Sequence, residues 1–176
     1  MLRRDHHGTR RDRPASVYHM RQRMLAVGDD YSIEDSAGRQ VFRVDGKVAR
    51  LRKTLILEDL HGREVYKLKE HVINVRDTMA IEDANGTVAL VKHALINPIR
   101  ERFSVHFEQG GAEWEIHGNV VDHEYEVRGP VGKVGEVSKR WLRAADTYSI
   151  AVEPGEDDAL VVAIAIVIDE MAHPRK

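Results

Sequence analysis

The chain contains no cysteine, and this absence excludes disulfide bonds, thiolate catalysis and zinc sites built on cysteine ligands. Aromatic residues make up only 6% of the sequence, which is too few for a platform that stacks nucleic-acid bases. The longest apolar run, Ala159–Ile168, falls well short of the roughly 20 residues that a membrane-spanning helix needs. The sequence therefore predicts no transmembrane segment.

What is present is typical of a folded domain with a charged N-terminal leader. Of the 176 residues, 42% are hydrophobic and 32% are charged. Residues 1–23 hold seven Arg against two Asp, a local charge of +5 in a chain whose net charge is −2. A basic, apolar-poor segment cannot bury enough surface to order itself. We therefore predict a basic leader over residues 1–19, either solvated or touching an anionic partner, and a single domain over residues 20–176.

A short pattern returns every 24 residues along the first half of the chain. Each copy has an aliphatic residue, Glu, Asp, two variable residues, Gly and, further on, Val, as in Ile33–Val41 and Leu57–Val65. In the third copy, Ile81–Val88, the last apolar position comes one residue early. Asp followed three residues later by Gly suits the first and fourth positions of a tight turn, so each copy predicts strand, turn, strand. A period of this size indicates one repeated supersecondary unit.

Beyond the repeats, apolar and polar residues alternate with period two, for example over Phe103–Glu108 and Trp114–His117. This alternation places one face of a strand on a core and the other in water. Turn signals recur at Gly38, Gly62, Gly86, Gly110-Gly111, Gly129-Pro130 and Pro154-Gly155. Six turns imply about twelve antiparallel strands, which favours a closed barrel or a sandwich.

The last segment, Ala159–Ile168, is apolar on every side and is flanked by acidic residues. Acidic residues in a first turn favour a helix, β-branched content favours a buried strand, and periodicity alone does not decide. A helix of this composition must be buried all round. Such a helix is about 10–12 Å wide, so an eight-stranded barrel has no room for it, whereas twelve strands can enclose it. The sequence therefore predicts a mostly β protein, a twelve-stranded antiparallel closed β-barrel enclosing a C-terminal hydrophobic α-helix.

Five segments carry a resemblance to a known family: Tyr31–Gly46, Arg52–Gly62, Gly118–Val127, Ser138–Trp141 and the closing apolar segment. In this order along the chain they resemble the LURP-one-related family. No single segment is specific, but their ordered set is, and the resemblance covers nearly the whole chain. It implies the tubby-like fold, a twelve-stranded barrel threaded by a hydrophobic helix, which Tubby C-terminal domains and phospholipid scramblases share. Members of the family usually begin near Met20, which supports the predicted leader.

The resemblance implies a binding role. Tubby domains hold anionic headgroups with basic side chains, but no motif of this chain matches that pocket, so those residues are not carried over. Scramblases have palmitoylation features that a cysteine-free chain lacks, which argues against lipid scrambling. We expect a non-enzymatic binding, interaction or scaffold module with a protein partner. The alternative is binding of anionic phospholipid or phosphoinositide at a membrane surface.

A search for catalytic motifs finds no Gly-rich phosphate loop, nucleophile elbow or His-Glu-x-x-His. In an alternating strand His123 would project away from its two acidic neighbours. His106 and His117 occupy polar-face positions of facing strands and could pair, but two ligands do not make a zinc site. The Glu-Asp pairs recur with the turns, and their Asp members are expected to cap the turn backbone. We therefore predict no enzymatic activity, no catalytic residue, no metal site and no cofactor.

Three groups of basic residues are the candidates for contact with an anionic lipid. They are Arg50, Arg52 and Lys53, then Arg100 and Arg102, then Lys139 and Arg140. The last group flanks Trp141, and an aromatic residue between cations suits a lipid interface, although a core tryptophan with a solvated basic rim is the alternative. The expected location is the cytoplasm, with peripheral membrane contact as the alternative. Nucleic acid is not an expected partner, because its contact would depend on the leader alone.

Overall fold

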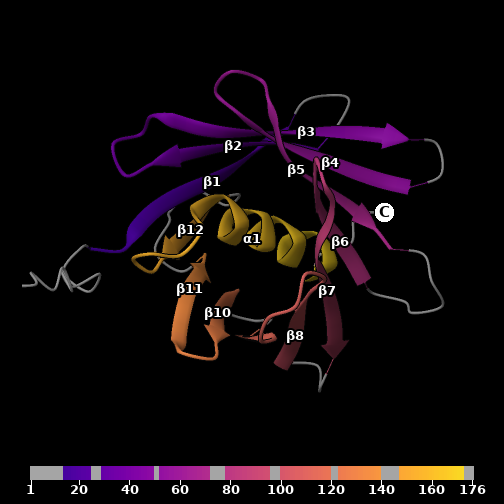
Figure 1. Ribbon diagram of the computed structural model, residues 1–176. Coiled ribbons are helices and arrows are strands. Elements are labelled where there is room, and N and C mark those ends of the chain that lie inside the picture. The colour runs from indigo at the N-terminus through magenta and orange to yellow at the C-terminus, as the bar shows by residue number, and fades with distance from the viewer. Residues whose placement is uncertain are drawn as a thin grey trace, which may run out of the picture.

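Alternating apolar residues on many short strands, followed by one apolar helix, fold into a closed β-barrel around that helix (Figure 1). The computed structural model describes residues 14–24, 29–49, 52–71, 78–95, 100–119, 123–139 and 147–172. Within these ranges the strands are β1 (Ser16–Met24), β2 (Asp29–Asp35), β3 (Gln40–Ala49), β4 (Arg52–Asp59), β5 (Glu64–Glu70), β6 (Thr78–Asp83), β7 (Gly86–Leu95), β8 (Arg100–Phe107), β9 (Trp114–Asn119), β10 (Glu124–Gly129), β11 (Gly132–Ser138) and β12 (Thr147–Val152).

Each strand pairs antiparallel with its neighbours in sequence, and β1 closes the ring by pairing with β12. In the closing pair Met20 lies opposite Tyr148, and both side chains are buried. Closure leaves none of the twelve described strands with a free edge to pair with another chain. The predicted twelve-stranded antiparallel barrel is confirmed.

The first two repeats fold into the same Asp-capped hairpin turn. In the β4–β5 turn the carboxylate of Asp59 accepts hydrogen bonds from the backbone N–H groups of His61, at 2.8 Å, and Arg63, at 3.0 Å. Gly62 has a φ of 71°, in the left-handed region that glycine adopts without strain. Asp35 makes the equivalent contacts in the β2–β3 turn. The prediction that these aspartates cap the turn backbone is confirmed.

The third repeat is one residue shorter because its turn is tighter. Asp83 lies opposite Gly86 in the β6–β7 pair, so the loop between them has two residues. In the β4–β5 turn, by contrast, the N–H of Asp59 donates to the carbonyl of Arg63, the residue after Gly62. This turn therefore closes one residue beyond its glycine, whereas the β6–β7 turn closes at the glycine itself. This difference explains why Val88 comes one position early in the pattern.

The helix α1 (Asp158–Ala172) lies inside the barrel, which decides the question that periodicity left open (Figure 1). The side chain of Asp157 accepts a hydrogen bond from the N–H of Leu160 at 3.0 Å and so caps the first turn. Every residue from Leu160 to Ile168 is buried. Inward-facing strand residues such as Leu57 and Ile150 belong to the same apolar cluster. The barrel therefore has a core filled by its own chain.

The first strand begins inside the predicted leader. Ser16–His19 belong to β1 and pair with β12 residues from Val152 back to Ser149. These four residues thus help to close the barrel, and the strand begins at Ser16 rather than at Met20. Residues 1–13 of the predicted leader lie outside the described residues.

Because the strands alternate in direction, their connections fall at two ends of the barrel. We call one end the turn end; it carries the N-terminus of α1 and the turns β2–β3, β4–β5, β6–β7, β8–β9 and β10–β11. We call the other end the loop end; it carries the C-terminus of α1 and the starts of the even-numbered strands β2, β4, β6, β8, β10 and β12.

Candidate functional site

The topology brings the three predicted basic groups to the loop end, although they are about 40–50 positions apart in the sequence. Their described members are Arg52 and Lys53 at the start of β4, Arg100 and Arg102 at the start of β8, and Lys139 just after β11. Arg50 and Arg140 lie outside the described residues, as does Trp141. Antiparallel pairing is the cause, because each of these positions follows an odd-numbered strand or begins an even-numbered one.

Arg100 and Arg102 line a groove of about 780 Å³ over β8–β11, here the loop-end groove. Both residues are exposed. Across the sheet Arg102 lies opposite His117, His117 opposite Glu126, and Glu126 opposite Glu136. Because neighbouring strands are about 4.8 Å apart, the charge changes from positive to negative over roughly 15 Å.

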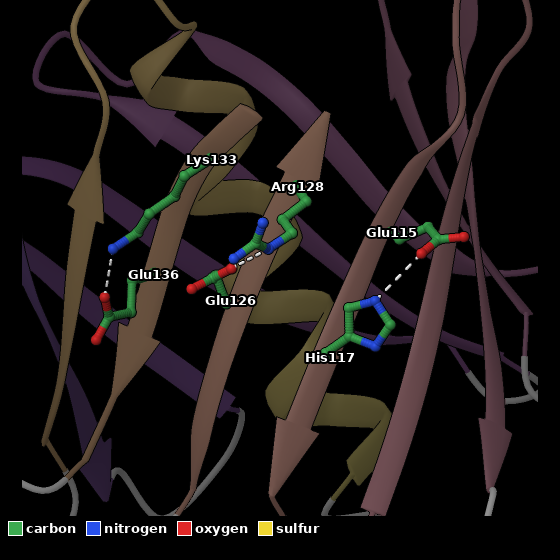
Figure 2. A network of polar contacts seen from close by, with 6 residues as sticks. All are labelled: Glu115, His117, Glu126, Arg128, Lys133 and Glu136. Atoms are coloured by element: carbon green, nitrogen blue, oxygen red, sulfur yellow. Dashed lines mark hydrogen bonds and ion pairs between the residues drawn. The ribbon is translucent and has the colours of Figure 1, made fainter. Parts of the chain in front are cut away.

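On the acidic side of this groove the charged side chains are held by hydrogen bonds and ion pairs, each within one strand (Figure 2). The pairs are His117 with Glu115 at 3.1 Å, Arg128 with Glu126, and Lys133 with Glu136 at 2.6 Å. The hydrogen bond to Glu136 raises the pKa of Lys133. Exposed pairs of this kind contribute about 0–1 kcal/mol each, so their charges can be exchanged for contacts with a partner at small cost.

The floor of the loop-end groove depends on one glycine. A Cβ atom on Gly118 would lie 2.1 Å from Cδ1 of Tyr125, so the tyrosine ring occupies the space of the missing side chain. From there the Tyr125 hydroxyl donates a hydrogen bond to Glu101 at 3.0 Å. Burial, and then the negative charge of Glu101, raises the pKa of Tyr125. Gly118, Tyr125 and Glu101 all line the groove, so its floor is also part of the buried interior.

Further polar groups are buried inside the barrel at the same end. Oε1 of Glu101 lies 3.3 Å from Nε2 of His93, an ion-pair distance without hydrogen-bond alignment. At the C-terminus of α1 the Tyr31 hydroxyl lies 3.0 Å from Oδ2 of Asp169 and 2.6 Å from Oε1 of Glu170. Together with Tyr125 these residues form a buried polar layer, which connects the groove floor to the end of the helix.

Sequence reasoning missed this layer, although one signal for it was available. The alternation that places Phe103 and Val105 on the inner face of β8 places Glu101 there as well. A carboxylate at an inward position predicts a buried polar partner. Its partners Tyr125 and His93 come from β10 and β7, and only the folded barrel identifies them.

The structure differs from the sequence interpretation at three histidines. His106 and His117 do not pair, because the β8–β9 register places Arg102 opposite His117, and His106 instead contacts Glu113 at 3.3 Å. His123 does not lie in an alternating strand, since it precedes β10 and has a φ of 50°. Among the described residues, no three His, Asp or Glu side chains are arranged to hold a metal ion.

Lys139 is engaged within the fold. Its ammonium group lies 5.2 Å from the ring centroid of Tyr148, a cation–π contact. Lys139 is partly buried, unlike Arg100 and Arg102. The described cations that face solvent in the loop-end groove are therefore those of β8.

The described ranges contain no helix of the length and apolar character needed to cross a bilayer. A closed twelve-stranded antiparallel barrel around a C-terminal helix defines the class of fold. The model of the LURP-one-related family matches residues 16–169, and the chain belongs to this family.

Two relatives extend this comparison. "Uncharacterized protein YxjI" of Bacillus subtilis (strain 168) is 26% identical over 154 residues, which covers 88% of this chain and 92% of the relative. An X-ray structure of an Arabidopsis thaliana protein superposes with a TM-score of 0.66 at 18% identity, over 89% of this chain and 92% of the other. At that identity the second likeness concerns the fold.

Proposed function

We propose that this domain is a non-catalytic binding module and that the loop-end groove receives a protein partner. Within the described residues α1 and the inward-facing side chains of the strands form one buried apolar cluster, which directs the search for a partner site to the outer surface. The observation that carries the proposal is the groove of about 780 Å³ whose β8 side is cationic and whose β10–β11 side is acidic.

A groove with both signs of charge suits a partner surface that carries both. Opposite charges steer two proteins together and fix their orientation, while rim pairs add little to stability. Carboxylates of the groove are paired with cations of their own strands, Glu126 with Arg128 and Glu136 with Lys133. Such mutual pairing supports recognition rather than acid–base catalysis, which requires a group poised to exchange a proton with a substrate.

Site-specific crosslinking tests this proposal. A photo-reactive amino acid at position 102 should form one discrete adduct in an extract of cells that express the protein, and Glu126→Arg in the same chain should reduce its yield. The matched control places the photo-reactive residue at position 63, an exposed position of the turn end. The same adducts from both positions, or none from position 102, would contradict the proposal.

Anionic phospholipid is a second candidate ligand, favoured by the convergence of three basic groups on one end of the barrel. Each cation near an anionic membrane surface is worth roughly 1 kcal/mol. Several such residues at one end would hold the domain at a membrane surface with the loop end facing the lipid. In this case the domain acts as a peripheral cytoplasmic module.

Vesicle co-sedimentation distinguishes the two candidates. If lipid is the ligand, Arg100→Glu/Arg102→Glu should weaken binding to phosphatidylserine-containing vesicles by about tenfold or more, because each reversal removes an attraction and adds a repulsion. Binding should also fall with salt, since screening lengths shrink to about 8 Å at physiological ionic strength. Arg39→Glu/Arg63→Glu at the turn end is the charge-matched control. Equal binding by both double variants would exclude the β8 cations as a lipid site.

A further inference from the structure

A second groove, of about 720 Å³, lies at the turn end of the barrel, here the turn-end groove. It runs between the β10–β11 turn and the segment that joins β12 to α1, and Trp114 lines it. At the tip of the β10–β11 turn Val131 is 98% exposed. Val131 and the indole of Trp114 give the groove apolar surface that a bound segment of protein would cover.

The charge of the turn-end groove is not balanced within the fold. Glu153 and Glu156 line it, and neither carboxylate has an ion-pair partner in the part of the chain that the structure describes. Lys133 also lines the groove, but its ammonium group is bound to Glu136 and adds only a longer-range attraction to Glu153. The groove therefore offers two carboxylates to a cationic group that supplies the missing partner.

The same groove lies where the N-terminal leader joins the barrel. Ala15 is one of its lining residues, and β1 begins at the next position. Since a chain extends at most about 3.6 Å per residue, the two residues from Ala15 to Arg13 span at most roughly 7 Å and the five residues to Arg10 at most roughly 18 Å. The covalent reach of a leader that joins the barrel at Ala15 thus includes the groove with its two carboxylates.

We propose that the segment Arg10–Arg13 binds the turn-end groove of its own chain, with its guanidinium groups at Glu153 and Glu156, and so covers Trp114 and Val131. Exposed ion pairs are individually weak. A short tether, however, holds a segment at an effective concentration of about the millimolar range, so weak pairs suffice for occupancy. The leader is then an intramolecular ligand that an external basic segment must displace to reach the groove.

Quenching of tryptophan fluorescence by acrylamide tests the proposal in the full chain. The chain has two tryptophans, so Trp141→Phe leaves Trp114 as the reporter. Arg10→Glu/Arg11→Glu/Arg13→Glu, here the leader reversal, should increase the quenching of Trp114. Glu153→Lys/Glu156→Lys, here the groove reversal, should do the same. The two sets combined should restore the low quenching of the native chain, because the charges are again opposite.

A matched control and a defined contrary result make this test decisive. Glu64→Lys/Glu70→Lys changes the net charge by the same amount as the groove reversal, at exposed positions of β5, and should leave the quenching unchanged. Unchanged quenching in both reversals, or an additive rather than a restored value in the combination, would overturn the proposal.

A peptide experiment gives a second readout that does not depend on the Trp141 substitution. The synthetic peptide Leu2–Arg13 should bind the leader-reversed chain in calorimetry, and should bind the native chain about tenfold more weakly, because the native groove is already occupied. Adding the groove reversal to the leader-reversed chain should abolish this binding. Equal affinity for all three chains would show that the peptide does not use this groove.

Discussion

The turn end and the loop end of this barrel are stabilised by contacts of different range. At the turn end, Asp59 is bonded to Arg63, four positions along the chain. At the loop end, Tyr31 reaches Asp169, which is 138 positions away, and Tyr125 reaches Glu101 across 24 positions. The Asp-capped hairpin turns of the turn end are thus built from local contacts that repeat, whereas the buried polar layer of the loop end depends on partners that only the closed barrel brings together.

This difference determines where substitutions should spread their effects. A local turn contact involves few residues, so its loss is confined to one hairpin. A contact in the buried polar layer connects strands with the helix, so its loss affects several elements at once. Substitutions at the two ends, and in the helix that joins them, therefore test this difference in range.

The largest effect is expected at Ile164, in the middle of the helix that both ends share. Ile164→Asp would bury an unpaired carboxylate, at a cost of several kcal/mol against a total stability of about 5–15 kcal/mol. We expect this variant not to fold cooperatively in thermal or urea unfolding. Ile164→Val is the control, with an expected loss of about 0.5–1.5 kcal/mol. A cooperatively folded Ile164→Asp protein would contradict the central position of α1.

A smaller but substantial effect is expected at Gly118 of the loop end. In Gly118→Val the new side chain would collide with the ring of Tyr125, and such overpacking costs about 1–3 kcal/mol. The urea midpoint should fall accordingly. In a Tyr125→Ala background the same substitution should cost less, which a double-mutant cycle measures. Equal costs in both backgrounds would mean that the ring does not occupy this space.

At the turn end the expected effect is smaller and depends on pH. The hydrogen bond from the Arg63 backbone N–H, together with its guanidinium group, lowers the pKa of the Asp59 carboxyl from 3.8 to about 2. Since the folded-state pKa lies below the unfolded value, this stabilisation is present above pH 3.8 and is lost as the pH falls towards 2.

Asp59→Asn should therefore lower the melting temperature at pH 6, by less than Gly118→Val does, and the difference from the native chain should shrink between about pH 4 and 2. Asp45→Asn, a change in β3 away from the turns, is the control. A difference that stays constant over this range of pH would show that the charge of Asp59 does not contribute.

The smallest effect is expected at Tyr66, whose hydroxyl lies 3.3 Å from Oδ2 of Asp157 next to the start of α1. Burial, and then the negative charge of Asp157, raises the pKa of Tyr66 from 10 to about 12. Stability linked to this group is present below pH 10 and is lost as the pH rises towards 12. In an absorbance titration at alkaline pH, Tyr66→Phe should remove the signal of one tyrosine that ionises near pH 12. Removal of a tyrosine that ionises near pH 10 would show that the hydroxyl of Tyr66 is not buried beside Asp157.

Much of the fold could be predicted because it rests on local patterns. Aspartate and glycine three positions apart specify each turn, and alternation specifies the inner face of strands such as β8. Even the choice of a helix for Ala159–Ile168 followed from the width of a helix with its side chains, because a barrel of about twelve strands is wide enough to enclose one. The start of the first strand was less predictable, because Ser16–His19 carry no repeat and are held by β12 at the other end of the chain.

The candidate site was predictable only in part. The basic groups around Arg52, Arg100 and Lys139 are visible in the sequence, but their meeting at one end is not. Nor does the sequence show that Lys139 lies over Tyr148 while Arg102 faces solvent.

The sequence by itself determined the repeated hairpins, the number of strands and the apolar helix, because each depends on residues a few positions apart whose conformational preferences are local. The tertiary structure alone decided which polar groups share the interior with the helix and which charges face each other across the loop-end groove. The physical reason is how far apart along the chain the contacting residues lie. Strand register and barrel closure, which no short segment encodes, decide which distant residues meet, and burial then requires those residues to satisfy one another.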